Sequence, residues 1–160
     1  MLSGHYKDPK NKLPNDLIKK IIATKDFNLG YFYTRQLLFA TFDLEMHTSK
    51  KPVDPTALYK KLYHEFTTIK PLEETHFPAS FGHMMGGYDA GYYGYLWSDV
   101  FAQDMFTKFE KAGLLNAKVG MSYRKNILEK GDTETADKLL ASFLGRSPNN
   151  KAFFKRLKIK

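Results

Sequence analysis

Apolar residues recur at helical spacing along most of the chain. A first run follows Asn15 or Asp16, either of which can cap a helix. Its apolar members lie on one helical face: Leu17, Ile18, Ile21 and Ile22. Asn28 and Gly30 interrupt the pattern, and residues 29–47 then predict a longer helix. Because this helix is apolar on more than one face, we expect it to be buried.

A third helix is predicted to begin after Asp54, because Asp is a favoured N-cap and Pro55 would occupy the first helical position. Residues 69–89 then change in character: Gly, Pro and His replace the periodic apolar residues, which predicts a long loop. Long ordered loops tend to carry function. Asp89 is expected to cap the following helix, over residues 90–112.

Three shorter helices are predicted in the last third of the chain. Gly113 ends the preceding helix, and Asn116 can cap the next one. Another apolar run ends at Gly145, and residues 149–159 form the last. The chain contains no internal repeat and no convincing strand pair, so we predict an all-α fold, as a single helical unit over residues 1–160.

Composition narrows the class of protein. The 160 residues include 10 Tyr, 13 Phe and 1 Trp, which is 15% of the chain and too many for a disordered tail. Cysteine is absent, which excludes disulfides, thiolate zinc sites and cysteine nucleophiles. The sequence contains no apolar run of about 18 residues, and residues 1–8 lack the apolar stretch that is expected of a secretory signal. We therefore expect a cytoplasmic protein with no membrane partner.

The chain has 25 Lys and Arg and 17 Asp and Glu, a formal net charge of +8 at pH 7. This positive charge raises the question of a polyanionic partner. The basic residues fall singly or in pairs, and only residues 155–160 are locally dense. This spread is typical of a solvated helical surface, and we expect no nucleic-acid partner. The alternative is a basic helical module that binds nucleic acid or another protein. Nucleic-acid binding would weaken steeply with added salt.

The five histidines do not form a metal motif. They are His5, His47, His64, His76 and His83. A helical zinc site needs two histidines one turn apart, as in H-E-x-x-H, so that both face one ion. After His64-Glu65 the position of the second histidine is occupied by Thr68. No metal ligand is expected in this chain.

Three tyrosines are a candidate for binding chemistry. Tyr88, Tyr92 and Tyr95 stand at i, i+4 and i+7, which would place their phenols on one face of a helix. They follow His83, and Gly86-Gly87 could form a hinge between them. Phenols near an imidazole suit a substrate whose carbonyl oxygen needs hydrogen-bond donors. On spacing alone, tyrosines that only pack in a core are the simpler interpretation.

A family resemblance favours a binding role for these tyrosines over a packing role. Residues 77–99, with Gly82-His83, Gly86-Gly87-Tyr88 and Tyr92-Tyr93-Gly94-Tyr95, resemble the glycine- and tyrosine-rich segment of the thimet oligopeptidase, neurolysin and oligopeptidase A family of zinc metallopeptidases. Further matches occur in the same order along the chain, at residues 2–6, 35–36, 113–116, 118–121 and 143–146. Several separated matches in order make the resemblance specific.

The resemblance implies a zincin-like, all-helical endopeptidase with a deep channel that admits short peptides. In that family two histidines of H-E-x-x-H and a further glutamate hold zinc, and these precede the part that this chain resembles. The resemblance therefore implies that the chain is the C-terminal part of the catalytic region. It also implies that the zinc ligands lie in a missing N-terminal partner segment, and that the chain alone is inactive. A piece of a larger helical body is also expected to expose an apolar face and to self-associate.

The resemblance also implies roles for individual residues. Tyr95 matches the tyrosine that donates to the tetrahedral oxyanion, and His83 matches the loop histidine that helps hold the substrate or transition state. Tyr88 and Tyr92 match phenols that contact the peptide, and Gly86-Gly87 belong to the substrate-binding loop. The sequence departs from the family beside these positions, with Met84-Met85 after the histidine and Gly91 before the second phenol. These departures remove no donor.

Overall fold

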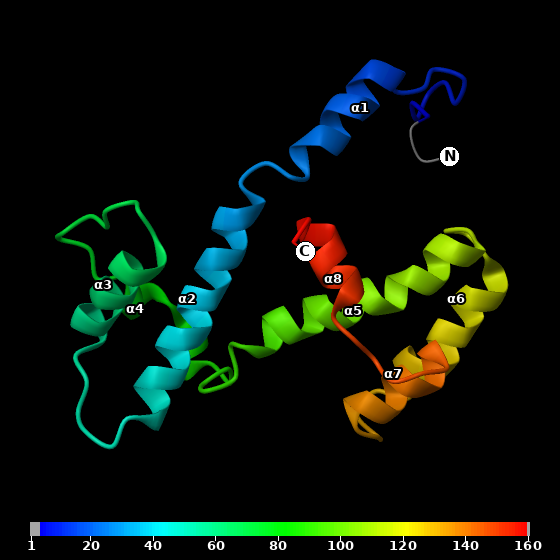
Figure 1. Cartoon of the computed structure of the whole chain (residues 1–160). Helices are drawn as coiled ribbons and strands as arrows, with labels where there is room; N and C mark the ends of the chain where they lie inside the picture. The colour runs from blue at the N-terminus through cyan, green and yellow to red at the C-terminus, as the bar shows by residue number, and fades with distance from the viewer. Residues whose placement is uncertain (1–3, 160) are drawn as a thin grey trace. The chain divides into compact units, whose positions relative to one another are not determined.

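The computed structural model describes residues 4–159 (Figure 1). Leu2 and Ser3, which belong to the first of the family matches, lie outside the described residues. The chain divides into two compact units, residues 1–33 and 34–160. The division falls within helix α2 (Leu29–Thr48).

In the first unit, α1 (Asn15–Thr24) is amphipathic and confirms the first predicted helix. An isolated antiparallel bridge between Gly4 and Lys12 precedes it. No residue of α1 is buried within the structure. Asn28 has a φ of 55°, a left-handed conformation that cannot continue a helix, and this explains the interruption before α2.

In the second unit, α2 packs against α3 (Pro55–Phe66), and the cap predicted for α3 is confirmed. One Asp54 carboxylate oxygen accepts the backbone N–H groups of Thr56 and Ala57. The buried residues of α2 are Leu38, Phe39, Ala40, Phe42 and Asp43. The expectation that the whole helix is buried was wrong, since its core-forming contacts are confined to this short stretch.

The segment over residues 69–89 is more ordered than the predicted loop. It contains one turn of helix, α4 (Phe77–Ser80), and a 3-10 turn, η1 (Gly82–Met85). The Phe77 ring stacks on Phe39 of α2 at a centroid distance of 5.3 Å and on Tyr59 of α3 at 4.7 Å. These aromatic contacts anchor the segment to the α2–α3 core. Figure 1 shows α4 beside α3.

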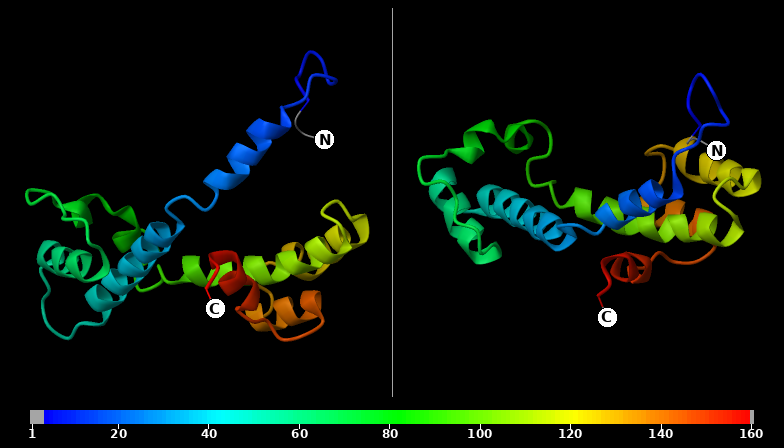
Figure 2. Two further views of the ribbon diagram at one scale, coloured as in Figure 1. Left: turned by 45° about the horizontal axis from the view of Figure 1, so that its top comes forward. Right: turned by 90° about the horizontal axis from the view of Figure 1, so that it is seen from above.

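The remaining helices pack around α5 (Gly94–Ala112) (Figure 2). They are α6 (Ala117–Tyr123), the π-helical turn η2 (Arg124–Leu128), α7 (Ala136–Leu144) and α8 (Lys151–Leu157). The helix ends at Gly113 and Gly145 and the cap at Asn116 are confirmed. The prediction that α5 begins at residue 90 was wrong, because Ala90 has a φ of 58° and residues 89–93 form a turn.

The prediction of an all-α chain is confirmed. Among residues 4–159 the backbone forms helices, turns and the one isolated bridge. Within the same residues, each helix is either too short or too polar to cross a lipid bilayer. The residues that the sequence marked as site candidates lie on η1, in the turn that precedes α5 and, for Tyr95, in the first turn of α5 itself.

Candidate active site

The candidate side chains gather around one imidazole. The ring of His83, on η1, lies 5.6 Å from the ring of Tyr88, 5.3 Å from that of Tyr92 and 5.8 Å from that of Tyr95. The ring of Phe81 belongs to the same group, at 5.1 Å from that of His83 and 5.3 Å from that of Tyr92. All distances join ring centroids. We call these five residues the aromatic cluster.

The phenols do not share one helical face, as their spacing suggested. Since α5 begins at Gly94, only Tyr95 lies on it, and Tyr88 and Tyr92 lie in the preceding turn. The turn folds back so that the rings of Tyr88 and Tyr95 stack at 5.2 Å with an interplanar angle of 14°. A turn and one helical position thus bring together what the sequence pattern assigned to a helix.

Tyr95 presents a protonated hydroxyl at the surface. Its side chain is 41% exposed, and Tyr88 is 46% exposed. A side-chain hydrogen bond with Tyr88 is the main cause of the raised pKa of Tyr95, and desolvation and the neighbouring phenols raise it further. The hydroxyl of Tyr95 is therefore a hydrogen-bond donor across the neutral pH range.

Tyr92 has different surroundings from the other two phenols. It is buried, and its hydroxyl donates a 3.1 Å hydrogen bond to Oε1 of Gln36 on α2. Its ring meets the edge of Phe39 at 5.6 Å and 89°. Burial raises the pKa of Tyr92, while Arg35 and the bond to Gln36 oppose that rise. The hydroxyl of Tyr92 is thus already occupied within the protein.

The glycines before the phenols have steric reasons to be glycine. A Cβ on Gly86 would lie 2.6 Å from the carbonyl oxygen of Gly82, which is too close for any side chain. Gly87 has a φ of 89°, a conformation that disfavours residues with a Cβ. The carboxylate of Asp89 accepts the N–H of Gly87 at 3.2 Å, and so caps this turn instead of α5.

Sequence reasoning missed Asp43, which supports the turn from α2. The side chain is fully buried, and its two oxygens accept the N–H groups of Ala90 at 3.0 Å and Tyr92 at 2.9 Å. The Nδ1 atom of His47 lies 2.9 Å from Oδ1. An acidic residue between Phe42 and Leu44 in an apolar helix was the available signal, because a carboxylate at such a position needs partners.

The described residues do not fit a zinc site. Within residues 4–159, no group of three His, Cys, Asp or Glu side chains is placed to hold a metal ion. His76 contacts the hydroxyl of Thr56 through Nδ1 at 3.3 Å, and His83 packs among aromatic rings. No chemical step is therefore assigned here to a metal bound by this chain.

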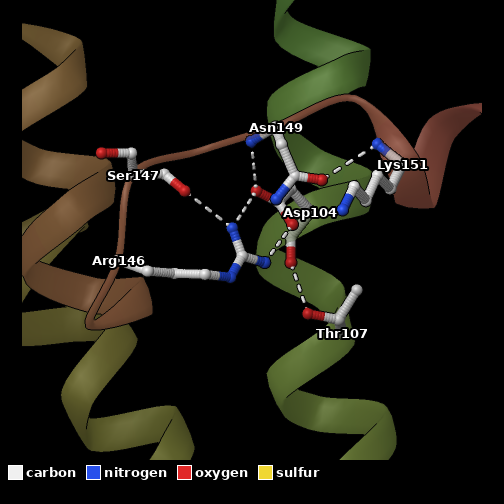
Figure 3. A network of polar contacts seen from close by, with 6 residues as sticks. All are labelled: Asp104, Thr107, Arg146, Ser147, Asn149 and Lys151. Carbon is white, nitrogen blue, oxygen red and sulfur yellow. Dashed lines mark hydrogen bonds and ion pairs between the residues drawn. The ribbon is translucent and has the colours of Figure 1, made fainter.

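A separate hollow of about 780 Å³ lies away from the aromatic cluster, beside the ion pair between Asp104 and Arg146 (Figure 3). Basic side chains from α5 and α8 line it, among them Lys111, Lys155 and Arg156. It shares no lining residue with the aromatic cluster. This hollow and the candidate chemistry are thus in different places.

Comparison with known proteins gives one consistent picture. The family model described as "Peptidase family M3" matches residues 1–159. A thimet-like oligopeptidase of Dictyostelium discoideum is 41% identical over 98% of this chain, and saccharolysin of Saccharomyces cerevisiae is 42% identical over 98%. Oligopeptidase A of Escherichia coli is 37% identical over 99%. The chain spans about a quarter of the length of these relatives, 24%, 22% and 24% respectively.

Proposed function

Because this chain belongs to peptidase family M3, we propose that it forms the substrate-binding and oxyanion-stabilising wall of a zinc endopeptidase that cuts short peptides. The matched relatives are oligopeptidases, which supports a peptidase role. The observation that carries the proposal is the aromatic cluster. The half-exposed phenols of Tyr88 and Tyr95 and the half-buried imidazole of His83 lie together at the N-terminal end of α5.

In this proposal the hydroxyl of Tyr95 donates to the carbonyl oxygen of the peptide bond that is cut. That oxygen becomes negatively charged as water adds to the carbonyl carbon, so a donor placed there stabilises the transition state more than the bound substrate. The raised pKa of Tyr95 keeps the proton on the phenol. Substrate binding would exchange the internal bond with Tyr88 for a bond to the peptide.

His83 and Tyr88 would hold the peptide beside this donor, with Gly86-Gly87 letting the loop adjust. Tyr92 is buried, so its ring would contact a peptide only after the side chains around it move. A contact through its hydroxyl would first have to break the bond to Gln36. We therefore assign the donor role to Tyr95 and assign Tyr92 mainly to support.

The metal would be held by residues outside the 160 described by this sequence. This chain spans about a quarter of the matched relatives, and the printed sequence contains no H-E-x-x-H. Zinc, when bound, polarises the scissile carbonyl and makes water a stronger nucleophile at neutral pH. We expect the 160-residue chain alone, even with added zinc, to be inactive toward peptides. Cytoplasmic location and self-association through exposed apolar residues also stay predictions.

The test is Tyr95→Phe in a full-length protein that carries this chain. We expect kcat to fall roughly a hundred- to a thousandfold while KM stays close to its original value, because the lost bond forms fully only in the transition state. Tyr93→Phe is the matched control: Tyr93 is similarly exposed, at 46%, and is not a member of the aromatic cluster.

Retained kcat with weaker peptide binding would refute the oxyanion role. Nucleic-acid binding that decreases steeply with salt, in a protein without peptidase activity, would instead favour the basic-module alternative.

A further inference from the structure

We propose that Asp43 is a positioning residue for the reaction: its buried carboxylate holds the turn that aims Tyr95 at the substrate. This inference rests on the proposed function, because it assumes that Tyr95 is the oxyanion donor. Asp43 contacts the backbone N–H groups of Ala90 and Tyr92. It would act through the backbone of the turn that precedes α5.

The connection from Asp43 to Tyr95 consists of two successive hydrogen bonds. Oδ2 of Asp43 accepts the N–H of Tyr92 at 2.9 Å, and the carbonyl oxygen of Tyr92 accepts the N–H of Tyr95 at 3.2 Å. The peptide units of Tyr92 thus lie between the carboxylate and the donor residue. A shift of the turn would be passed directly to the first turn of α5.

The turn needs an external support. Ala90 has a φ of 58°, which is uncommon for a residue with a Cβ and costs energy unless its surroundings hold it. The N–H of Ala90 donates to Oδ1 of Asp43 at 3.0 Å. In addition, α5 has no side-chain cap of its own at Tyr93. A carboxylate from α2, 47 residues earlier in the chain than Ala90, supplies the acceptor that the local sequence lacks.

The support requires a carboxylate in particular. Its two oxygens accept two N–H groups, one each, which an amide could not match because it has only one acceptor atom. The Nδ1 atom of His47 lies 2.9 Å both from Oδ1 and from the backbone carbonyl oxygen of Asp43. A buried carboxylate is also stable only with several partners. Among the described residues, no buried side-chain oxygen or nitrogen lacks a partner, so the Asp43 site is complete as it stands.

Gln36 also holds this turn, at a second point. It accepts the hydroxyl of Tyr92, so α2 holds Tyr92 at its backbone through Asp43 and at its side chain through Gln36. The ring of Tyr92 in turn lies 5.0 Å from that of Tyr95. The orientation of the donor therefore depends on α2 along two routes, and the carboxylate serves the backbone route.

The first test is Asp43→Asn in a full-length protein that carries this chain. The substitution keeps the size of the side chain and removes one acceptor. We expect kcat to fall about ten- to a hundredfold with KM changed less than about threefold, since small misplacements of a catalytic group have effects of this size. Amide hydrogen exchange at Ala90 and Tyr92 should become faster. Unchanged kcat, or a loss confined to KM, would overturn the inference.

Asp104→Asn is the matched control. Asp104 is also a buried carboxylate, and it also accepts a backbone N–H from a distant segment, that of Asn149 at 2.8 Å. Its substitution should lower thermal stability and leave the kcat of the folded protein unchanged. If both variants lowered kcat equally, the effect of Asp43 would be general destabilisation and the inference would fail.

A double variant separates this inference from the proposed function. If Asp43 acts through Tyr95, Asp43→Asn should have little further effect on kcat in a Tyr95→Phe background. If Tyr95→Phe alone leaves kcat unchanged, the oxyanion role itself is wrong. If it lowers kcat and Asp43→Asn multiplies that loss in full, the oxyanion role stands and the positioning role of Asp43 is wrong.

A backbone substitution serves where Asp43→Asn does not fold. Replacing Tyr92 by its α-hydroxy acid changes the Gly91–Tyr92 amide into an ester and deletes the N–H that Oδ2 accepts. It also weakens the Gly91 carbonyl oxygen as the acceptor of the Gly94 N–H. The side chain and the bond to Gln36 are kept. We expect a tenfold or larger fall in kcat with KM retained, and an unchanged kcat would overturn the proposal.

Discussion

The ion pair between Asp104 and Arg146 should be the most sensitive single polar contact in the α5–α8 part of the chain. Asp104 lies on α5 and is 1% exposed. Arg146, just after the end of α7, donates through both terminal nitrogens, at 2.5 Å to Oδ1 and 2.8 Å to Oδ2 (Figure 3). This bidentate pair ties the connection between α7 and α8 to the middle of α5.

The magnitude follows from what Arg146→Ala would leave behind. Removing one partner of a fully buried ion pair costs about 3 to 5 kcal/mol. Two features reduce that figure: the Arg146 side chain is 43% exposed, and the N–H of Asn149 still donates to Asp104. We therefore expect a loss of about 2 to 3 kcal/mol, in the range for hydrogen bonds to a charged group. In a chain of this size that corresponds to a fall in Tm of roughly 5 to 10 °C.

Thermal and urea unfolding of the full chain measure this loss. Arg146→Lys keeps the charge and loses the planar fork, so it should recover only part of the stability. A double-mutant cycle with Asp104→Asn isolates the pairwise contribution. A loss of unfolding free energy below about 0.5 kcal/mol for Arg146→Ala would show that the pair is an ordinary surface contact, and the predicted role of the buried carboxylate would be wrong.

Two further predictions concern pH and the glycine turn. The hydrogen bond from Arg146 lowers the pKa of Asp104 below its ordinary 3.8. The pair's contribution to stability is therefore complete above pH 3.8 and is lost as the pH falls through the lower pKa of the folded state. The unfolding free energies of wild type and Arg146→Ala should converge in acid, and a difference that stays constant with pH would contradict this. Gly86→Ala should lower the free energy of unfolding by about 1 to 3 kcal/mol, because its Cβ would lie 2.6 Å from the Gly82 carbonyl oxygen. Gly82→Ala, with open space at its Cβ, should be tolerated. Equal unfolding curves for the two variants would show that the turn relaxes to accept the Gly86 side chain.

Most helix ends were predictable because their signals are local. Asp54 before Pro55 caps α3 with its own side chain, and Asn116 caps α6 in the same way. Gly145 ends α7 in the left-handed conformation that glycine adopts readily. Each of these interactions joins residues within a few positions of one another, so the residues that decide the structure are visible together in the sequence.

The start of α5 was not predictable from such signals. Asp89 has the composition of a cap, but its carboxylate binds the N–H of Gly87. The acceptor for Ala90 and Tyr92 comes from Asp43, which lies 47 and 49 residues away in the chain. A helix pattern with period 3.6 therefore continued through residues that tertiary contacts hold in a turn.

The candidate site divides in the same way between sequence and structure. The chemical groups of the site, namely the imidazole of His83, the phenols of Tyr88, Tyr92 and Tyr95 and the Gly86-Gly87 pair, were visible in the sequence, because a motif records residue types. The exposure and the partner of each hydroxyl follow from tertiary contacts. Gln36 accepts the hydroxyl of the buried Tyr92, while Tyr95, bonded to the half-exposed Tyr88, stays exposed on α5. Exposure and hydrogen-bond partners depend on contacts between distant segments, and periodicity along one segment carries no record of them.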